Sequence, residues 1–445
     1  MLAALKERLG TERCLFFEGS EMIEELVDGG SGAQDEIREP DIQLIQEECR
    51  VRDLPGIVTG HYTFRYSGTG SLMTAGTFKD FDAYSHILYL HVSPTTIHER
   101  RYMDLTKRPD IDLVQLSDWQ HKEYAALRER CVEAKIPLMS IPDEVAGPEN
   151  VVRVIQDLLS PIHEMRLEEV EAFIEREVSP TVKSALILDA DKTLSEADGG
   201  ALAREMMGIG NRSSLQQILG SYGYNLEAFV TLAMLYCQKT PFDFSTGCNQ
   251  AARKIKLYGP IEAILRQVAR ESSLQIIVIT CGLKKVWERV LQRHGFHSIL
   301  GHGLGSIPVI GNGQLDLPVV TPQTKSLLVR QLQERGIYVT AFGDSPLDLS
   351  MLSAADNAVI VVGPESTRSK TMDNPLAYSI QEGKVRARQA LMGDVSRRLI
   401  NGPFQLRDSD KPPIEAADIS LPVVDISSEQ FLVQVLHSRR NTAGV

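Results

Sequence analysis

Acidic side chains follow an apolar run near the middle of the chain. Asp189 and Asp191 belong to the segment DADKT, directly after residues 184–188. Along an extended strand, alternation places these two carboxylates on the same side. Adjacent carboxylates repel unless a cation or a shared proton relieves them, and Mg²⁺ binds one or two carboxylates together with substrate phosphate. The pair therefore predicts a magnesium and phosphate site at the carboxyl end of a strand, although an acidic strand-end turn is the plain alternative.

Three further groups of polar residues follow in order along the chain. Thr280 and Gly282 end a second apolar run, where a hydroxyl and a flexible glycine at a helix start can donate to a phosphoryl oxygen. Lys325 lies in the first turn of a predicted helix, where the helix dipole favours acids, so it indicates a nearby anion. Asp344 and Asp348 follow a third apolar run in the segment GDSPLD. Each group alone has a structural explanation, but the ordered set predicts one phosphate-handling site.

Alternating apolar runs and amphipathic helices must position these groups. The chain has 445 residues, enough for two or three domains. The pattern predicts an α/β fold of two domains, each with a parallel sheet flanked by helices. The expected order is an N-terminal domain over 1–160, a linker helix over 161–180, a second domain over 181–400 and a C-terminal extension over 401–445. Within the second domain, residues 195–257 are expected to form a helical cap that excludes water from the site.

Composition restricts the class of protein. The chain has 47 Lys and Arg against 59 Asp and Glu, a net charge of −12, which counts against broad binding to nucleic acid. The six cysteines are scattered without a C-x-x-C pair, as in a reduced intracellular protein. No apolar run reaches membrane-spanning length, and the start, MLAALKERLG, predicts an amphipathic helix rather than a signal peptide. We therefore expect a cytoplasmic enzyme without a membrane partner.

Basic residues gather after the strongest apolar run of the first domain. Arg100, Arg101, Lys107 and Arg108 follow residues 83–92. This segment resembles the lid of P-loop kinases, in which arginines contact the transferring phosphate. The Walker A pattern G-x-x-x-x-G-K-[ST] is absent from the sequence, however. The resemblance implies a P-loop-kinase-like domain without its Walker A loop, with a possible nucleotide as ligand and no predicted kinase activity. A solvated basic helix face is the alternative.

Residues 184–365 resemble the haloacid dehalogenase superfamily of phosphohydrolases. The resemblance rests on D-x-D-x-T, Thr-x-Gly, Lys and G-D-S-x-x-D in that order, and the helical insert is similar to the cap of the phosphoserine-phosphatase-like branch. It implies that Asp189 is the nucleophile, forming an aspartyl-phosphate, and that Asp191 is the general acid and base. The implied phosphate-binding groups are Thr280, Gly282 and Lys325. The implied Mg²⁺ site uses Asp189, the main-chain carbonyl of Asp191, Asp344 and Asp348, of which Asp348 orients the lysine or the metal-bound water.

Three functions remain open at this level. The favoured one is a Mg²⁺-dependent phosphatase acting on a small phosphorylated metabolite. The insert lacks a recognisable acidic and arginine pattern for amino-acid binding, so phosphoserine itself is not predicted as substrate. A nucleic-acid end-processing protein of the polynucleotide kinase/phosphatase type is the second, and the acidic net charge counts against it. A non-catalytic nucleotide-binding or scaffold protein is the third, which the missing Walker A loop favours and the complete second set of motifs opposes.

Overall fold

The computed structural model describes most of the chain. The described residues are 2–18, 34–65, 71–74, 78–103, 111–142, 147–159, 163–209, 218–269, 271–296, 307–314, 318–364, 366–368, 370–382, 385–392 and 421–437. They form two compact units. The first comprises Met1–Pro161, Gln216–Gly223 and Val230–Thr240, and the second comprises Ile162–Leu215, Tyr224–Phe229 and Pro241–Val445. Lys107, Arg108 and the segment 401–420 lie outside the described residues.

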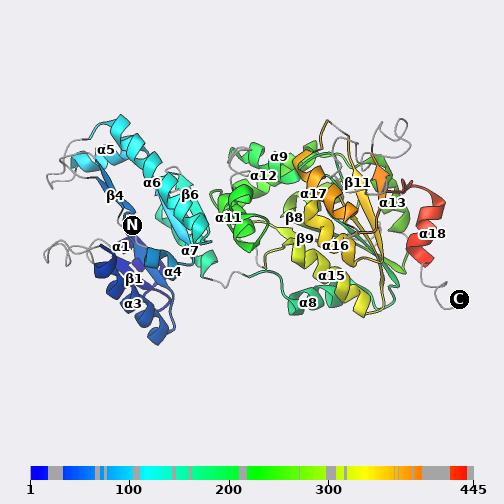
Figure 1. Cartoon of the computed structure of the whole chain (residues 1–445), viewed down its shortest axis with the longest axis horizontal. Helices are drawn as coiled ribbons and strands as arrows, with labels where there is room; N and C mark the ends of the chain where they lie inside the picture. The colour runs from blue at the N-terminus through cyan, green and yellow to red at the C-terminus, as the bar shows by residue number, and fades with distance from the viewer. Residues whose placement is uncertain are drawn as a thin grey trace. The chain divides into compact units, whose positions relative to one another are not determined.

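The first unit, blue to cyan in Figure 1, contains short paired strands among helices. Its helices are α1 (Leu2–Leu9), α3 (Gln34–Arg52), α4 (Phe78–Ala83), α5 (Pro94–Met103), α6 (Leu113–Glu133) and α7 (Pro148–Leu158). Its strands are β1 (Leu15–Glu18), β2 (Gly56–Thr59), β3 (Thr63–Arg65), β4 (Leu72–Thr74), β5 (Ile87–His91) and β6 (Leu138–Pro142). Strand β1 pairs with β2 and β5 with β6, both in parallel, whereas β3 and β4 are antiparallel.

Two parts of the expected cap belong to the first unit. The first part, Gln216–Gly223, precedes helix α11 (Leu226–Tyr236), and the second part, Val230–Thr240, contains most of that helix. The side chain of Gln238 donates to the carbonyl of Ser140, and Arg153 donates to the carbonyl of Cys237. Carbonyls just beyond a helix end lack intrahelical donors, so Arg153 satisfies one of these. The insert therefore packs partly with residues that precede the second domain in the sequence.

The second unit is built on a six-stranded parallel sheet in the order β12-β11-β10-β7-β8-β9. The strands are β7 (Ser184–Leu188), β8 (Leu274–Leu283), β9 (Val309–Asn312), β10 (Tyr338–Gly343), β11 (Asn357–Val362) and β12 (Arg388–Leu391). The helices are α8 (Leu167–Glu177), α9 (Gly199–Met207), α12 (Pro241–Lys254), α13 (Gly259–Val268), α14 (Lys284–Arg293), α15 (Pro322–Glu334), α16 (Leu349–Ala354), α17 (Lys370–Gln381) and α18 (Glu429–His437), with a 3₁₀ turn, η2, at Pro346–Asp348.

Burial explains why this sheet forms where the apolar runs predict it. All five residues of β7 are buried, as expected for a strand inside a parallel sheet that helices cover on both faces. Helix α8, which corresponds to the expected linker helix, buries Phe173 and Ile174 in the same core as Ile187. It is therefore part of the second unit's packing.

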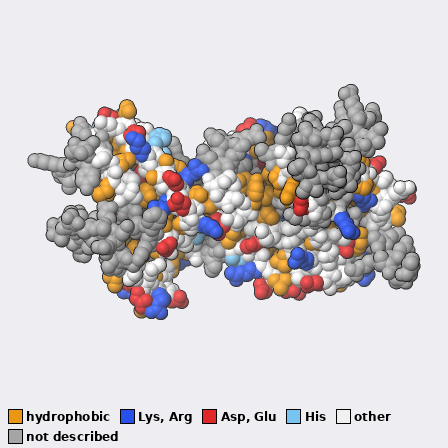
Figure 2. Space-filling model, viewed as in Figure 1, with side chains coloured by type: hydrophobic (Ala, Val, Ile, Leu, Met, Phe, Trp, Pro, Cys, Tyr) orange, Lys and Arg blue, Asp and Glu red, His pale blue; other side chains and the backbone are white. Residues whose placement is uncertain are grey.

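The C-terminal residues described also pack on this sheet. Phe431 of α18 is buried and makes an edge-to-face contact with Phe342 of β10. The backbone of Gln389 exchanges hydrogen bonds with Pro422 and Val424. None of the helices among the described residues is long and apolar enough to cross a membrane. On the face seen in Figure 2, acidic and basic side chains are interspersed.

Candidate active site

The residues singled out by the motifs lie at the carboxyl edge of the central strands. Asp189 directly follows β7, and Asp344 directly follows β10, which pairs with β7 on one side. Strand β8 pairs with β7 on its other side and carries Thr280 near its end. Parallel pairing brings these strand ends to one edge of the sheet, which is where α/β proteins bind ligands.

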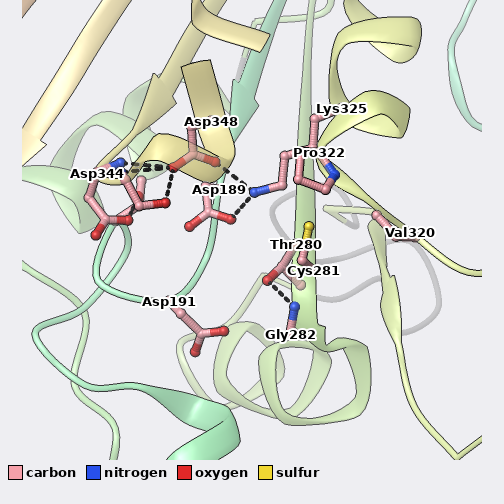
Figure 3. A network of polar contacts seen from close by, with 12 residues as sticks. Asp189, Asp191, Thr280, Cys281, Gly282, Val320, Pro322, Lys325, Asp344 and Asp348 are labelled. Atoms are coloured by element: carbon pink, nitrogen blue, oxygen red, sulfur yellow. Dashed lines mark hydrogen bonds and ion pairs between the residues drawn. The ribbon is translucent and has the colours of Figure 1, made fainter. Parts of the chain in front are cut away.

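Three carboxylates and one lysine form the centre of the site (Figure 3). Asp189, Asp344 and Asp348 each offer an oxygen, and these oxygens lie within 4.8 Å of one another. Lys325 Nζ lies 2.5 Å from Asp189 Oδ1 and 2.6 Å from Asp348 Oδ1. The lysine side chain is 1% exposed and that of Asp348 is fully buried, so water screens these charges very little.

The charges of this cluster do not balance. When all groups are ionised, three carboxylates face one ammonium, which leaves two uncompensated negative charges. Burial, and then the charge of Asp348, raise the pKa of Asp189 to about 7. Burial and both neighbouring carboxylates also hold the pKa of Asp344 well above its usual range. Burial lowers the pKa of Lys325, but the two carboxylates it contacts outweigh burial and hold that pKa well above its ordinary value.

The loop after β10 is shaped around Asp348. The Oδ2 atom of Asp348 accepts hydrogen bonds from the backbone of Asp344 and from the backbone and hydroxyl of Ser345. A Cβ atom at Gly343 would lie 2.4 Å from the Cβ of Asp348, so only glycine fits there. Thr193 donates to Asp344 Oδ1 at 3.0 Å. The first three bonds hold Asp348 within its own loop, and the Thr193 bond ties Asp344 to the turn after β7.

Asp191 lies apart from the acidic cluster. Its Oδ1 atom accepts from the backbone N–H of Gly199 at 2.5 Å and from Trp287 Nε1 at 3.2 Å. Strand β7 ends at Leu188, so strand alternation does not cover both residues, and the expectation that Asp189 and Asp191 project to one side stays a prediction. The following turn includes Lys192 in the left-handed region, with φ of 63°. Burial, Asp198 and Asp189 raise the pKa of Asp191 to about 8.

The segment of Thr280 belongs to a longer strand than the sequence predicts. Strand β8 continues to Leu283, and the backbone of Gly282 donates to Thr280 Oγ1 at 2.9 Å. Asn312 supports this end of the strand by donating to the carbonyl of Cys281. Burial raises the pKa of the Cys281 thiol to about 12, so the thiol stays neutral beside the carboxylates.

A family model described as haloacid dehalogenase-like hydrolase matches residues 186–353. These residues are a haloacid dehalogenase-like hydrolase domain. None of the curated proteins compared matches the chain. This finding does not extend to residues 1–160, whose P-loop-kinase-like interpretation stays a prediction.

Two solved structures that are similar to this chain illustrate the comparison. A phospho-aspartyl intermediate analogue of phosphoserine phosphatase is 13% identical, covers 46% of this chain and 92% of its own, and has a TM-score of 0.32. A haloacid dehalogenase family hydrolase from Salmonella enterica subsp. enterica serovar Typhi is 17% identical, covers 46% of this chain and 74% of its own, and has a TM-score of 0.33.

The haloacid dehalogenase-like domain brings together four of the residues that the motifs singled out, namely Asp189, Asp344, Asp348 and Lys325. The hydroxyl groups of Thr193 and Ser345 donate hydrogen bonds to the site carboxylates. Neither residue was among the predicted site residues, although both lie within the motif segments. Trp287 was also missed. Its contact with Asp191 spans 96 positions in the sequence, and no local pattern indicates it.

The acidic cluster has the chemistry of a hard-cation site. Carboxylate oxygens are ligands of Mg²⁺, and the raised carboxyl pKa values express the same shortage of positive charge that a divalent ion would relieve. Asp189, Asp344 and Asp348 therefore fit a Mg²⁺ ion. The side chain of Asp191 is not in this group of described residues.

Proposed function

We propose that the haloacid dehalogenase-like domain is a Mg²⁺-dependent phosphomonoesterase that works through an aspartyl-phosphate on a small phosphorylated metabolite. The observation that supports it most is the pairing of Lys325 with Asp189 inside an acidic cluster at the sheet edge. A phosphate monoester and an attacking carboxylate are both anions, so the reaction needs concentrated positive charge at the nucleophile. A buried lysine bonded to the nucleophile supplies part of that charge.

In the first step, Asp189 attacks phosphorus. Lys325 holds Oδ1, which leaves Oδ2 as the attacking oxygen. The new bond joins Oδ2 to phosphorus while the bond from phosphorus to the leaving oxygen breaks. Asp191 in its protonated form gives its proton to that oxygen, and the products are an alcohol and the aspartyl-phosphate. General acid catalysis of this kind contributes on the order of 10²–10⁴ in rate.

In the second step, water releases the phosphate. Asp191, now a carboxylate, takes a proton from water as the water oxygen attacks phosphorus. The bond between phosphorus and Asp189 breaks, which restores the nucleophile and regenerates the protonated acid. Thr280 and Gly282 would hold the phosphoryl oxygens at the end of β8, and Lys325 remains against Asp189 throughout.

Asp189, Asp344 and Asp348 would hold the metal, together with the main-chain carbonyl of Asp191. Bound Mg²⁺ would supply positive charge to the transferring phosphoryl group. Thr193 and Ser345 keep the metal-binding carboxylates in place by the hydrogen bonds described above. The assignment of these ligands is part of the proposal.

A small metabolite is favoured over a nucleic-acid end as substrate. The net charge of −12 repels a long polyanion, and the face in Figure 2 carries charges of both signs interspersed. Release of phosphate from DNA or RNA 3′ ends in preference to small phosphate esters would contradict this part of the proposal without touching the chemistry.

The decisive experiment replaces the nucleophile. Asp189→Asn should abolish Mg²⁺-dependent hydrolysis of 4-nitrophenyl phosphate while the circular dichroism spectrum stays that of the wild type. The matched control is Asp243→Asn, the same substitution at an exposed residue of α12, and it should keep full activity. A screen of sugar, amino-acid and nucleotide phosphates then identifies the substrate. Activity of the Asp189→Asn variant at the wild-type level would refute the proposal.

A further inference from the structure

The carboxylate of Asp191 lies in a narrow slot between three residues. Its Oδ1 atom accepts from Gly199 N–H and from Trp287 Nε1. Its Oδ2 atom lies where a side chain at Gly282 would be, 2.1 Å from the position of a Cβ. A Cβ at Gly199 would likewise lie 3.0 Å from Oδ1 and 3.2 Å from Trp287 Nε1. A side chain at Gly282 would therefore displace the carboxylate, one at Gly199 would crowd it, and two donors on one oxygen hold it in place.

Trp287 is placed to do this by the strand that carries Thr280. Helix α14 begins at Lys284, directly after β8 ends at Leu283, so the position of its first turn follows from that of the strand end. Trp287 is fully buried. A buried indole N–H needs an acceptor, and Asp191 provides it. The ring is thus held by the core while its one polar atom faces the carboxylate.

We propose that Trp287 is a positioning residue for proton transfer by Asp191. This inference rests on the proposed phosphatase function. Because both donors contact Oδ1, Oδ2 is the oxygen left to carry and release the proton. Oδ2 lies beside Gly282, at the end of β8 where the phosphoryl group would bind. Trp287 thereby helps to turn the proton-bearing oxygen toward the leaving group, and without it only the Gly199 N–H holds Oδ1, so the carboxylate is less firmly oriented.

The consequence depends on the leaving group. A weakly basic leaving group such as 4-nitrophenolate departs with little help from an acid, whereas phenolate, which is more basic, needs the proton more. A misoriented Asp191 therefore slows the hydrolysis of phenyl phosphate more than that of 4-nitrophenyl phosphate. A loss of folded protein or a general packing defect would slow both equally. The ratio of the two rates separates positioning from structural support.

The two tryptophans of the chain allow a matched test. Trp287→Phe keeps an aromatic ring and removes the N–H, and Trp119→Phe makes the same change in the first unit, where Trp119 donates to Thr63. Val286→Ala is a second control, since Val286 is a fully buried neighbour on α14. With Mg²⁺ present, Trp287→Phe should lower kcat/KM for phenyl phosphate about tenfold and that for 4-nitrophenyl phosphate about twofold or less. Both controls should leave the ratio unchanged.

An isosteric replacement covers the case in which Trp287→Phe fails to fold. In the Trp119→Phe background, biosynthetic incorporation of 3-benzothienylalanine alters only position 287 and replaces the N–H by sulfur without changing the ring shape. We expect the same selective fall in kcat/KM for phenyl phosphate. An equal fall for both substrates, or no fall, would overturn the positioning role while leaving the phosphatase proposal intact. Absence of phosphatase activity in the wild type would instead refute the proposed function.

Discussion

Strands β7 and β5 come from similar apolar runs but reach different environments. SALIL of β7 has every residue buried and neighbours on both sides in a six-stranded sheet. Among the strands that the structure describes, ILYLH of β5 pairs only with β6, and all its residues are partly exposed. An apolar run predicts a strand in both cases. A site at the sheet edge needs several adjacent strand ends, and the described residues provide that arrangement around β7.

The carboxylates of the two units differ in the same way. Glu123 in the first unit accepts hydrogen bonds from the backbone and hydroxyl of Thr63 and from the hydroxyl of Tyr89. Only uncharged groups donate these three hydrogen bonds to the Glu123 carboxylate, which is typical of a carboxylate with a structural role. Asp189 faces two other carboxylates and a lysine, and its pKa is raised. Strongly perturbed carboxyls of this kind concentrate at functional sites, so the contrast separates a supporting acid from a candidate catalytic one.

Among the variants that compare the two units, the largest effect on activity should come from removing the lysine. Lys325→Met keeps most of the side-chain volume and deletes the charge at the nucleophile. We expect kcat/KM for 4-nitrophenyl phosphate to fall on the order of 10²–10³. Glu123→Gln, in the first unit, should change it less than about twofold. Comparable losses in both variants would erase the distinction between the two units.

Stability should change in opposite directions in the two units. Without divalent metal, Asp344→Asn removes a like charge from the acidic cluster, so the melting temperature should rise. Glu123→Gln replaces charged hydrogen bonds by weaker ones and should cost roughly 1–2 kcal/mol. Scanning calorimetry in EDTA measures both. A melting temperature that falls in Asp344→Asn would contradict the account of an uncompensated cluster.

Asp189 of the acidic cluster and the neighbouring Asp191 predict how stability depends on pH. Folding raises the pKa of Asp189 from 3.8 to about 7 and that of Asp191 from 3.8 to about 8, so between these ordinary and raised values the folded chain binds more protons than the unfolded chain. Stability of the metal-free protein should therefore fall as pH rises through this range. Mg²⁺ should reverse most of the fall by compensating the ionised carboxylates. A melting temperature that rises over the same interval in EDTA would contradict the pKa directions.

The last comparison concerns two thiols, one in each unit, and leaves activity unchanged. Burial raises the pKa values of both Cys131 and Cys281 to about 12. Since the thiolate is the reactive form, alkylation by iodoacetamide at neutral pH should be on the order of 10³ slower at each than in the unfolded chain. Mass spectrometry of the alkylated peptides measures both rates. Rapid labelling of Cys281 in the folded protein would contradict the raised pKa of its thiol.

The sequence predicts the haloacid dehalogenase-like domain well because its signals are local. Asp344 and Asp348 share one short segment, and a buried strand precedes each of the motif carboxylates Asp189 and Asp344. It predicts less where geometry depends on contacts distant in sequence. The turn after β7 moves Asp191 away from the acidic cluster, and its partner Trp287 comes from another element. The first unit's interpretation rests on a resemblance that lacks its phosphate-binding loop.

The aspartyl-phosphate is the central claim, and trapping it is the most direct test. Asp191→Asn should slow water attack, so the intermediate should accumulate when 4-nitrophenyl phosphate and Mg²⁺ are mixed with the protein. Borohydride reduction converts an aspartyl-phosphate to homoserine, which mass spectrometry of the peptides locates. We predict homoserine at position 189. Turnover of the wild type with no homoserine at that position, or with the modification at another residue, would contradict the account.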